Sequence, residues 1–143
     1  MSIAVLALAG FFVSLYLWLW KVGVLGTIAC GDGGCETVQL SSYADFLGLP
    51  VAFHGMAGYL VLMIVSLVGL QPRWVAQRAP TVLLVVLAAI GVLFAGYLTY
   101  LEAAVIHAWC WWCVVSAVLI TAILAIAVAG LVAMHTARRT PQP

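Results

Sequence analysis

Charged residues are scarce in this chain of 143 amino acids, and their scarcity excludes several classes of protein. Lysine and arginine together number 5 and aspartate and glutamate 4, so charged side chains make up only 6% of the sequence. A water-soluble domain carries about 25% charged residues, and so few charges cannot solvate the surface of a folded protein of this size. Disorder is also excluded, because disordered chains combine high charge with low hydrophobicity. With a net charge of +1 and no basic run, we expect no binding to nucleic acid.

Long apolar runs take the place of the missing charges, and hydrophobic residues make up 67% of the sequence. A helix needs about 20 apolar residues to cross the hydrocarbon core, where an irregular backbone would leave polar groups unsatisfied. The first run lacks the basic start of a cleaved signal peptide, so we expect it to be retained. The sequence predicts an all-α membrane protein, one domain of residues 1–143 that forms a four-transmembrane-helix bundle. The four expected helices span about residues 3–24, 51–70, 81–101 and 109–134.

The few basic residues are distributed unevenly between the two ends of this bundle. Arg73 and Arg78 lie in the link between the second and third spans, and Arg138 and Arg139 follow the fourth span. Only Lys21 lies at the opposite end. By the positive-inside rule, both termini are expected in the cytoplasm. The opposite face is then the oxidising periplasm of a bacterium or the lumen of a eukaryotic organelle.

The outer loop of residues 25–50 contains a turn signal and, after it, a short apolar segment between two helix-cap signals. Gly31–Gly34 is glycine-rich and predicts a turn. Further along, Ser41 or Ser42 resembles a helix N-cap and Gly48 a C-cap. The segment between these caps is too short to span a membrane, so we expect a short helix lying on the membrane surface.

All four cysteines fall at the outer face in this topology. Cys30 and Cys35 flank the glycine-rich turn, whereas Cys110 and Cys113 form a CxxC motif that opens the fourth helix. Residues three apart on a helix lie about 5–6 Å apart, which is within disulfide range. A mobile pair and a rigid pair at one face suit an electron relay. The loop pair could exchange with a soluble protein while the rigid pair holds a sulfur against a ligand in the bilayer.

Two other interpretations of the cysteines remain open at this point. The pairs could be local structural staples, although closing so short a loop as a CxxC removes little chain entropy. Four thiolates could also bind zinc or a soft heavy metal, which would make the protein a metal-binding membrane transporter. A transporter is expected to carry polar or charged residues along its pathway, and only His54 is ionisable within the four spans.

Several short motifs follow one another between the loop cysteines and the CxxC pair. In chain order they are Cys30, the stretch CETVQLSSYA at 35–44, Gly48-Leu49-Pro50, Gly55, Tyr59 and Cys110-Trp111-Trp112-Cys113. In this order and spacing the chain resembles the vitamin K epoxide reductase family, and most closely its bacterial members. The DsbB-type oxidoreductases differ, because they place the CxxC pair before the loop pair.

The resemblance implies a helical bundle around a quinone, capped by a surface helix. It implies a membrane thiol:quinone oxidoreductase that reoxidises a periplasmic, thioredoxin-fold DsbA-like protein and reduces ubiquinone or menaquinone. The expected location is the bacterial inner membrane, with the active site at the periplasmic face. Many bacterial members carry a fused thioredoxin-like domain after the bundle, and none follows here, so we expect a partner in trans.

In the relay that we expect, each cysteine has its own part. The partner thiolate attacks Cys30 and forms a mixed disulfide. Cys35, once freed, attacks Cys110. Cys113 is then released as a thiolate beside the quinone and donates the electrons.

Four further residues are candidates for contact with the quinone. His54 lies inside a span about one turn from its outer end, and could donate a hydrogen bond to a quinone carbonyl. Tyr59 lies deeper in the same span. Trp111 and Trp112 fit an interfacial aromatic belt and could also line the quinone pocket.

The resemblance also locates two departures from the vertebrate enzymes. Their tyrosine that contacts vitamin K corresponds to Ala117 here, and their asparagine near the start of the second helix to about Val51. Both differences argue against epoxide reduction as the physiological task. Glu102 and His107 flank the short link before the CxxC motif. They could move protons to the reduced quinone, but we expect them in a solvated turn.

Overall fold

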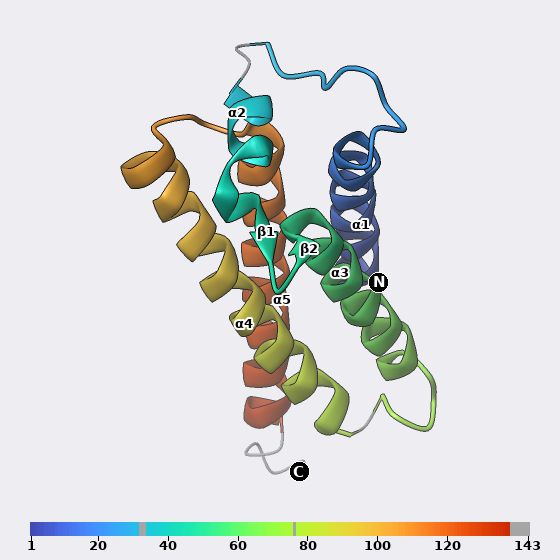
Figure 1. The fold of residues 1–143 in the computed structure, drawn as a ribbon. Coiled ribbons are helices and arrows are strands. Elements are labelled where there is room, and N and C mark those ends of the chain that lie inside the picture. Colours follow the sequence, from blue (N-terminus) through green and yellow to red (C-terminus); the bar gives the residue numbers. More distant parts are fainter. Residues whose placement is uncertain (32–33, 76, 138–143) are drawn as a thin grey trace, which may run out of the picture.

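The computed structural model describes residues 1–31, 34–75 and 77–137 (Figure 1). Four long helices coincide with the predicted spans, and their ends differ from the prediction by up to three residues. All four are long and apolar enough to cross a membrane. The predicted fold class is confirmed, and the protein is a multi-pass membrane protein. The four helices are α1 (Ser2–Lys21), α3 (Val51–Gly69), α4 (Ala79–Leu101) and α5 (Trp111–Ala137).

The four helices form a ring in which α1 packs against α3 and α5, and α4 packs against α5 and α3. Small residues permit the close approach of α1 to α3. A side chain at Gly10 would overlap the ring of Tyr59, and one at Gly55 would meet the hydroxyl of Ser14. The buried core inside the ring consists of Ala7, Tyr59, Leu62, Leu84, Ala88, Ile120, Ile123 and Ala127.

The outer loop folds differently from the prediction. A short helix is present, but it is α2 (Gly34–Leu40), before the predicted position. The chain then forms the 3₁₀ turn η1 (Ser42–Ala44) and a hairpin of β1 (Asp45–Phe46) and β2 (Leu49–Pro50). The predicted C-cap Gly48 belongs to the hairpin turn, where Leu47 and Gly48 have φ values of 53° and 78°. Two consecutive positive φ values are typical of a two-residue hairpin loop, so the cap prediction was wrong.

The helix α4 continues into a turn of π-helix, η2 (Glu102–Ile106), which ends at His107 in a left-handed conformation. This turn leads directly to the CxxC motif at the start of α5. In Figure 1, α2 and the link from η2 to α5 lie at one end of the bundle, and the link from α3 to α4 lies at the other.

The orientation prediction depends in part on residues that lie outside the described ranges. These residues are Arg138 and Arg139 of the tail. Asp32 and Gly33 of the predicted glycine turn also lie outside the described ranges. The described part of the α3–α4 link carries Arg73 and Arg78 at the end of the bundle away from α2. The cysteines and these arginines are therefore at opposite ends, as the predicted topology requires.

Candidate active site

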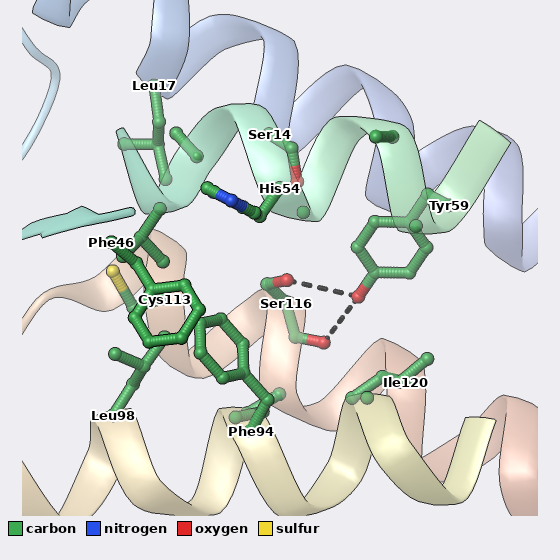
Figure 2. Close-up of a pocket in the computed structure, with 18 of the residues that line it drawn as sticks. Ser14, Leu17, Phe46, His54, Tyr59, Phe94, Leu98, Cys113, Ser116 and Ile120 are labelled. Carbon is green, nitrogen blue, oxygen red and sulfur yellow. Dashed lines mark hydrogen bonds between the residues drawn. The ribbon is translucent and has the colours of Figure 1, made fainter. Parts of the chain in front are cut away.

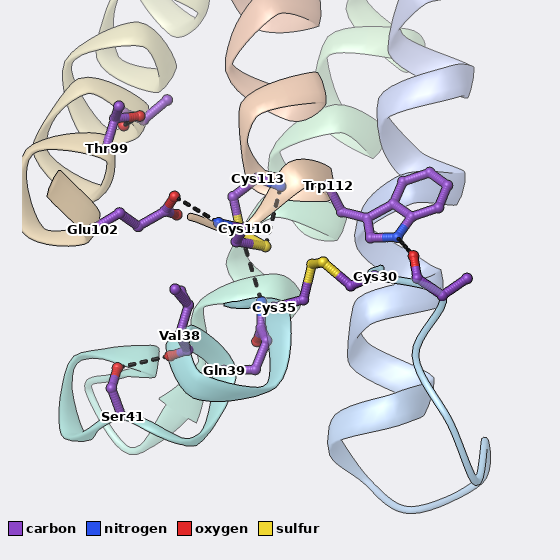
Figure 3. Close-up of a disulfide and its surroundings, with 12 residues drawn as sticks. Cys30, Cys35, Val38, Gln39, Ser41, Thr99, Glu102, Cys110, Trp112 and Cys113 are labelled. Atoms are coloured by element: carbon purple, nitrogen blue, oxygen red, sulfur yellow. Dashed lines mark hydrogen bonds between the residues drawn. A yellow bond between two sulfur atoms is a disulfide. The ribbon is translucent and has the colours of Figure 1, made fainter. Parts of the chain in front are cut away.

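Both cysteine pairs form disulfides, and the two disulfides lie in one cluster at the α2 end of the bundle (Figure 3). The Cα atoms are 6.0 Å apart in Cys30–Cys35 and 5.2 Å apart in Cys110–Cys113. Cys110 precedes the first residue of α5, and its sulfur accepts the backbone N–H of Cys113 at 3.3 Å. The CxxC motif thus straddles the helix start, which holds its two sulfurs in a fixed place.

The four sulfurs differ in their surroundings. Cys35 and Cys110 are completely buried, at 0% exposure each, whereas Cys30 and Cys113 are half-buried. Cys113 borders a large cavity inside the helix ring, and Cys110 is not among the residues that line it. Each disulfide therefore has one buried sulfur within the shared cluster and one sulfur at its edge.

A close approach of backbones brings the two disulfides together. Gly34, the first residue of α2, is so near to Trp109 that a side chain there would overlap the carbonyl oxygen of Trp109. Trp109 immediately precedes Cys110, and Gly34 immediately precedes Cys35. Glycine at residue 34 therefore sets the separation between the loop pair and the CxxC pair.

We predict that Gly34→Ala slows the passage of electrons between the pairs. The added methyl group must push α2 away from Trp109, and a displacement of about 1 Å can cost about 100-fold in rate. Quinone reduction driven by a protein dithiol is expected to fall, and reduction driven by dithiothreitol to stay near the wild-type rate. Gly31→Ala is the matched control, because nothing lies within 4 Å of the position of its added methyl group. Equal protein-driven rates in the two variants would contradict this role of Gly34.

Gln39 is a site residue that the sequence analysis did not single out. It lies on α2 four residues after Cys35, is 5% exposed, and its side-chain N–H group lies 3.8 Å from the sulfur of Cys113. The ammonium of Lys21 donates to the backbone carbonyl of Gln39 and pairs with Asp45 at 3.6 Å. The short helix thus reaches both disulfides, because it carries Cys35 itself and an amide directed at Cys113.

A cavity of about 490 Å³ lies between α3, α4 and α5, next to Cys113 (Figure 2). Its volume is within the range of small-molecule sites, about 300–1,000 Å³. Its walls are mostly apolar. Phe46 of β1 is one of the lining residues and contacts Phe94, with ring centroids 5.7 Å apart. A flat, largely apolar ring such as that of a quinone fits these walls, with the sulfur of Cys113 and the polar side chains of Gln39 and Glu102 at one end.

Two of the four residues predicted to contact the quinone line this cavity and two do not. His54 and Tyr59 line it, and both are visible in Figure 2. Trp111 is 68% exposed, while Trp112 packs on Tyr16 and donates its indole N–H to the carbonyl of Ala29 at 3.0 Å. The tryptophans fall on other faces of α5, because the face of Cys113 continues at every third or fourth residue. On that face the cavity is lined by Ser116, Ala117 and Ile120.

The polar side chains of the inner cavity already have partners within the protein. Tyr59 donates its hydroxyl to the carbonyl of Ser116 at 2.7 Å and lies 3.0 Å from the Ser116 hydroxyl. His54 Nδ1 lies 3.2 Å from the carbonyl of Pro50, and the His54 ring meets Phe46 edge to face. Ser116, which the sequence analysis missed, therefore links the wall formed by α5 to the wall formed by α3.

The two departures from the vertebrate enzymes also lie at this cavity. Val51 and Ala117 are both among its lining residues. Each is apolar, so neither can offer a hydrogen bond to a ligand at the place where the resemblance locates a polar side chain. Polar contacts must come from other residues of the wall.

Glu102 is buried at 2% exposure, so the expectation of a solvated turn was wrong for this residue. The π-helical turn folds its side chain inward, where a carboxylate oxygen accepts the backbone N–H of Cys110 at 3.2 Å. Its carboxylate and the sulfurs of Cys110 and Cys113 lie within 4.8 Å of one another. His107, which ends the same turn, is exposed as expected.

Adjacent disulfides beside a ligand-sized cavity, held by membrane-spanning helices, are the features of a membrane-embedded disulfide oxidoreductase. The comparison with known families agrees with this class. Residues 1–128 match the vitamin K epoxide reductase family, so the chain belongs to this family and the resemblance is confirmed. The family performs membrane redox chemistry with cysteine pairs and uses quinone or vitamin K substrates in general.

Proposed function

We propose that the protein is a thiol:quinone oxidoreductase that reoxidises a DsbA-like, thioredoxin-fold protein and reduces ubiquinone or menaquinone. The observation that carries the proposal is the position of Cys113, which belongs to a disulfide and at the same time borders the large cavity. A sulfur placed there can pass electrons to a quinone held in the cavity. The bound quinone would supply the two-electron redox chemistry, and the protein would position it.

The burial of the four sulfurs supports a fixed order of exchange. The partner thiolate attacks Cys30, the more exposed sulfur of the loop pair, and releases Cys35 as a thiolate. Cys35 attacks Cys110, which shares its buried cluster, and releases Cys113 as a thiolate at the cavity. The partner's second thiol then displaces Cys30, so that the partner leaves with a disulfide. Cys30 in turn displaces Cys35 from Cys110, which restores the loop disulfide and leaves the CxxC pair reduced.

Two electrons then leave the CxxC pair for the quinone, and two protons accompany them. The Cys110–Cys113 disulfide reforms, and the quinone becomes quinol. The Gln39 N–H group, 3.8 Å from the sulfur of Cys113, stabilises the thiolate that forms there. Over the whole cycle one partner dithiol is oxidised and one quinone is reduced.

The proposed location is the bacterial inner membrane, with both termini in the cytoplasm and the cysteines at the periplasmic face. The positions of Arg73 and Arg78, at the end of the bundle away from the cysteines, support this orientation. The partner would meet Cys30 from the periplasm. A topology reporter fused after residue 143 should be active only in the cytoplasm, and a periplasmic signal would contradict the orientation.

The alternative of a metal-binding transporter has one observation in its favour, the approach of Glu102, Cys110 and Cys113 within 4.8 Å. In the structure both of these sulfurs belong to a disulfide, in which neither is a thiolate available to a metal. We therefore favour the oxidoreductase, and metal analysis of the purified protein gives a direct check.

The proposal is tested by mixing the purified protein in lipid nanodiscs with a reduced DsbA-like protein and a short-chain ubiquinone or menaquinone without oxygen. We expect one quinol for each partner disulfide formed, with no dependence on added zinc. Zinc bound to the protein as isolated, together with no quinol above the uncatalysed rate, would contradict the oxidoreductase and favour the transporter.

A further inference from the structure

We propose, on the basis of the proposed function, that Glu102 carries a proton between the CxxC thiols and the quinone. Among the acidic residues that the structure describes, Glu102 alone is buried. Its carboxylate lies beside the CxxC disulfide in Figure 3 and also lines the large cavity. It therefore borders both the groups that release protons and the space where protons are consumed.

The surroundings of Glu102 do not explain its burial as a structural ion pair. Within the described ranges the salt bridge found joins Lys21 to Asp45, and no basic side chain pairs with Glu102. The one hydrogen bond that the described residues give to its carboxylate comes from the backbone N–H of Cys110. A carboxyl buried without a cation is costly, and it is the kind of group that enzymes use to transfer protons.

Other ionisable side chains also border the site, but they are placed less well for this role. His54 and Tyr59 also line the large cavity, but each is bonded to a backbone carbonyl. Tyr43 borders a small neighbouring cavity together with Glu102 and Cys113, and is 47% exposed. The carboxyl of Glu102 lies within 4.8 Å of the sulfurs of both Cys110 and Cys113.

The proton balance of the reaction gives Glu102 its role. The reduced pair carries two protons, and its oxidation to the disulfide releases two electrons. Both electrons pass to the quinone, and the two protons must reach the two quinone oxygens. The apolar cavity wall offers few groups that can receive a proton. Cys113 first bonds to the quinone ring, and its proton goes to one quinone oxygen. Cys110 then attacks the sulfur of Cys113, so that the S–S bond forms, the bond from sulfur to the ring breaks, and its electron pair stays with the quinone. The carboxylate of Glu102 takes the proton that leaves Cys110 and gives this proton to the other quinone oxygen. Glu102 ends the cycle in the state in which it began.

Two substitutions separate proton transfer from simple support of the CxxC motif. Glu102→Gln keeps an oxygen that can accept the N–H of Cys110 but cannot carry a proton. Glu102→Asp keeps the acid but shortens the reach to that N–H. If Glu102 only held the CxxC backbone, Glu102→Gln would behave as wild type and Glu102→Asp would be impaired. If Glu102 transfers a proton, Glu102→Gln is impaired and Glu102→Asp keeps most of the wild-type rate.

The experiment measures single-turnover reduction of a short-chain ubiquinone by protein previously reduced with dithiothreitol, in light and in heavy water. General acid–base groups contribute about 100- to 10,000-fold, so we expect Glu102→Gln to lose about 100-fold and Glu102→Asp to keep most of the rate. Without quinone, dithiothreitol should open the Cys110–Cys113 disulfide of Glu102→Gln at the wild-type rate, as measured by thiol alkylation.

The rates of the two Glu102 variants and their solvent isotope effects decide between proton transfer and simple support of the CxxC motif. A near wild-type rate in Glu102→Gln overturns the inference, and so does slow opening of its disulfide in the absence of quinone. If both variants are slow, a larger solvent isotope effect in Glu102→Gln than in wild type supports proton transfer, and an unchanged effect overturns it. Wild-type protein that reduces no quinone contradicts the proposed function, whereas active wild type with active Glu102→Gln contradicts only the role of Glu102.

Discussion

Replacing Cys113 with serine is expected to abolish quinone reduction, whether the donor is a protein dithiol or dithiothreitol. Cys113 is the CxxC sulfur at the cavity, and its loss leaves no thiolate there to donate electrons. Removal of a nucleophile typically costs at least about 1,000-fold in rate, so turnover should fall to background. The absorbance change of an added short-chain quinone measures this rate directly.

A second measurement on the same variant shows whether the fold is intact. The Cys30–Cys35 disulfide does not involve Cys113, so Cys113→Ser should still form a mixed disulfide between a reduced DsbA-like protein and Cys30. A gel under non-reducing conditions detects this species. Normal quinone turnover in Cys113→Ser would contradict the proposed electron relay through Cys113.

Removing the loop pair is expected to separate the two electron donors. In the double variant Cys30→Ser/Cys35→Ser, a protein dithiol has no accessible disulfide to attack, because Cys110 is completely buried and Cys113 faces the cavity. The rate of quinone reduction that the protein dithiol drives should fall at least about 1,000-fold, as expected when a reactive residue is lost. Dithiothreitol is small enough to enter and should keep a measurable rate.

Each alternative outcome for the double variant has a distinct meaning. If the protein dithiol drives turnover at the wild-type rate, the loop disulfide is a structural staple. If dithiothreitol fails completely as well, the loop disulfide is needed to hold α2, and with it Gln39, against the CxxC pair. The wild-type protein assayed with both donors is the reference.

The sequence allowed the helical bundle and the meeting of the cysteine pairs to be predicted, because both follow from length and hydropathy. A run of about 20 apolar residues has few alternatives to a membrane helix, and the two spans between Cys35 and Cys110 bring these cysteines to the same end. The predicted ends of the four helices were accordingly off by only a few residues.

The outer loop could not be predicted in the same way. Seven residues are too few for a stable isolated helix, so α2 depends on the burial of Cys35, Val38 and Gln39 against the bundle. That contact begins at Gly34, whose closeness to Trp109 has no signature in sequence spacing. The serines and Gly48, which were taken as caps of a later helix, instead serve the 3₁₀ turn and the hairpin.

The walls of the cavity show a similar division. His54 and Tyr59, both on the predicted second span, line the cavity. Trp111 and Trp112 do not line it, because the rotation of α5 about its axis depends on packing that hydropathy does not reveal. The contact of Glu102 with Cys110 depends on the single π-helical turn that begins at Glu102, because this turn shifts the residues after it relative to a regular helix.

The central claim, that the sulfur of Cys113 meets a quinone in the cavity, is tested most directly by the visible absorption of quinone-loaded protein. Cys110→Ser leaves Cys113 without its disulfide partner, as a free thiolate at the cavity, whereas Cys113→Ser leaves only the buried sulfur of Cys110. We predict a lasting thiolate–quinone charge-transfer band in Cys110→Ser and none in Cys113→Ser. No band in Cys110→Ser, or an equal band in both variants, would contradict the assignment of Cys113 as the sulfur that reduces the quinone.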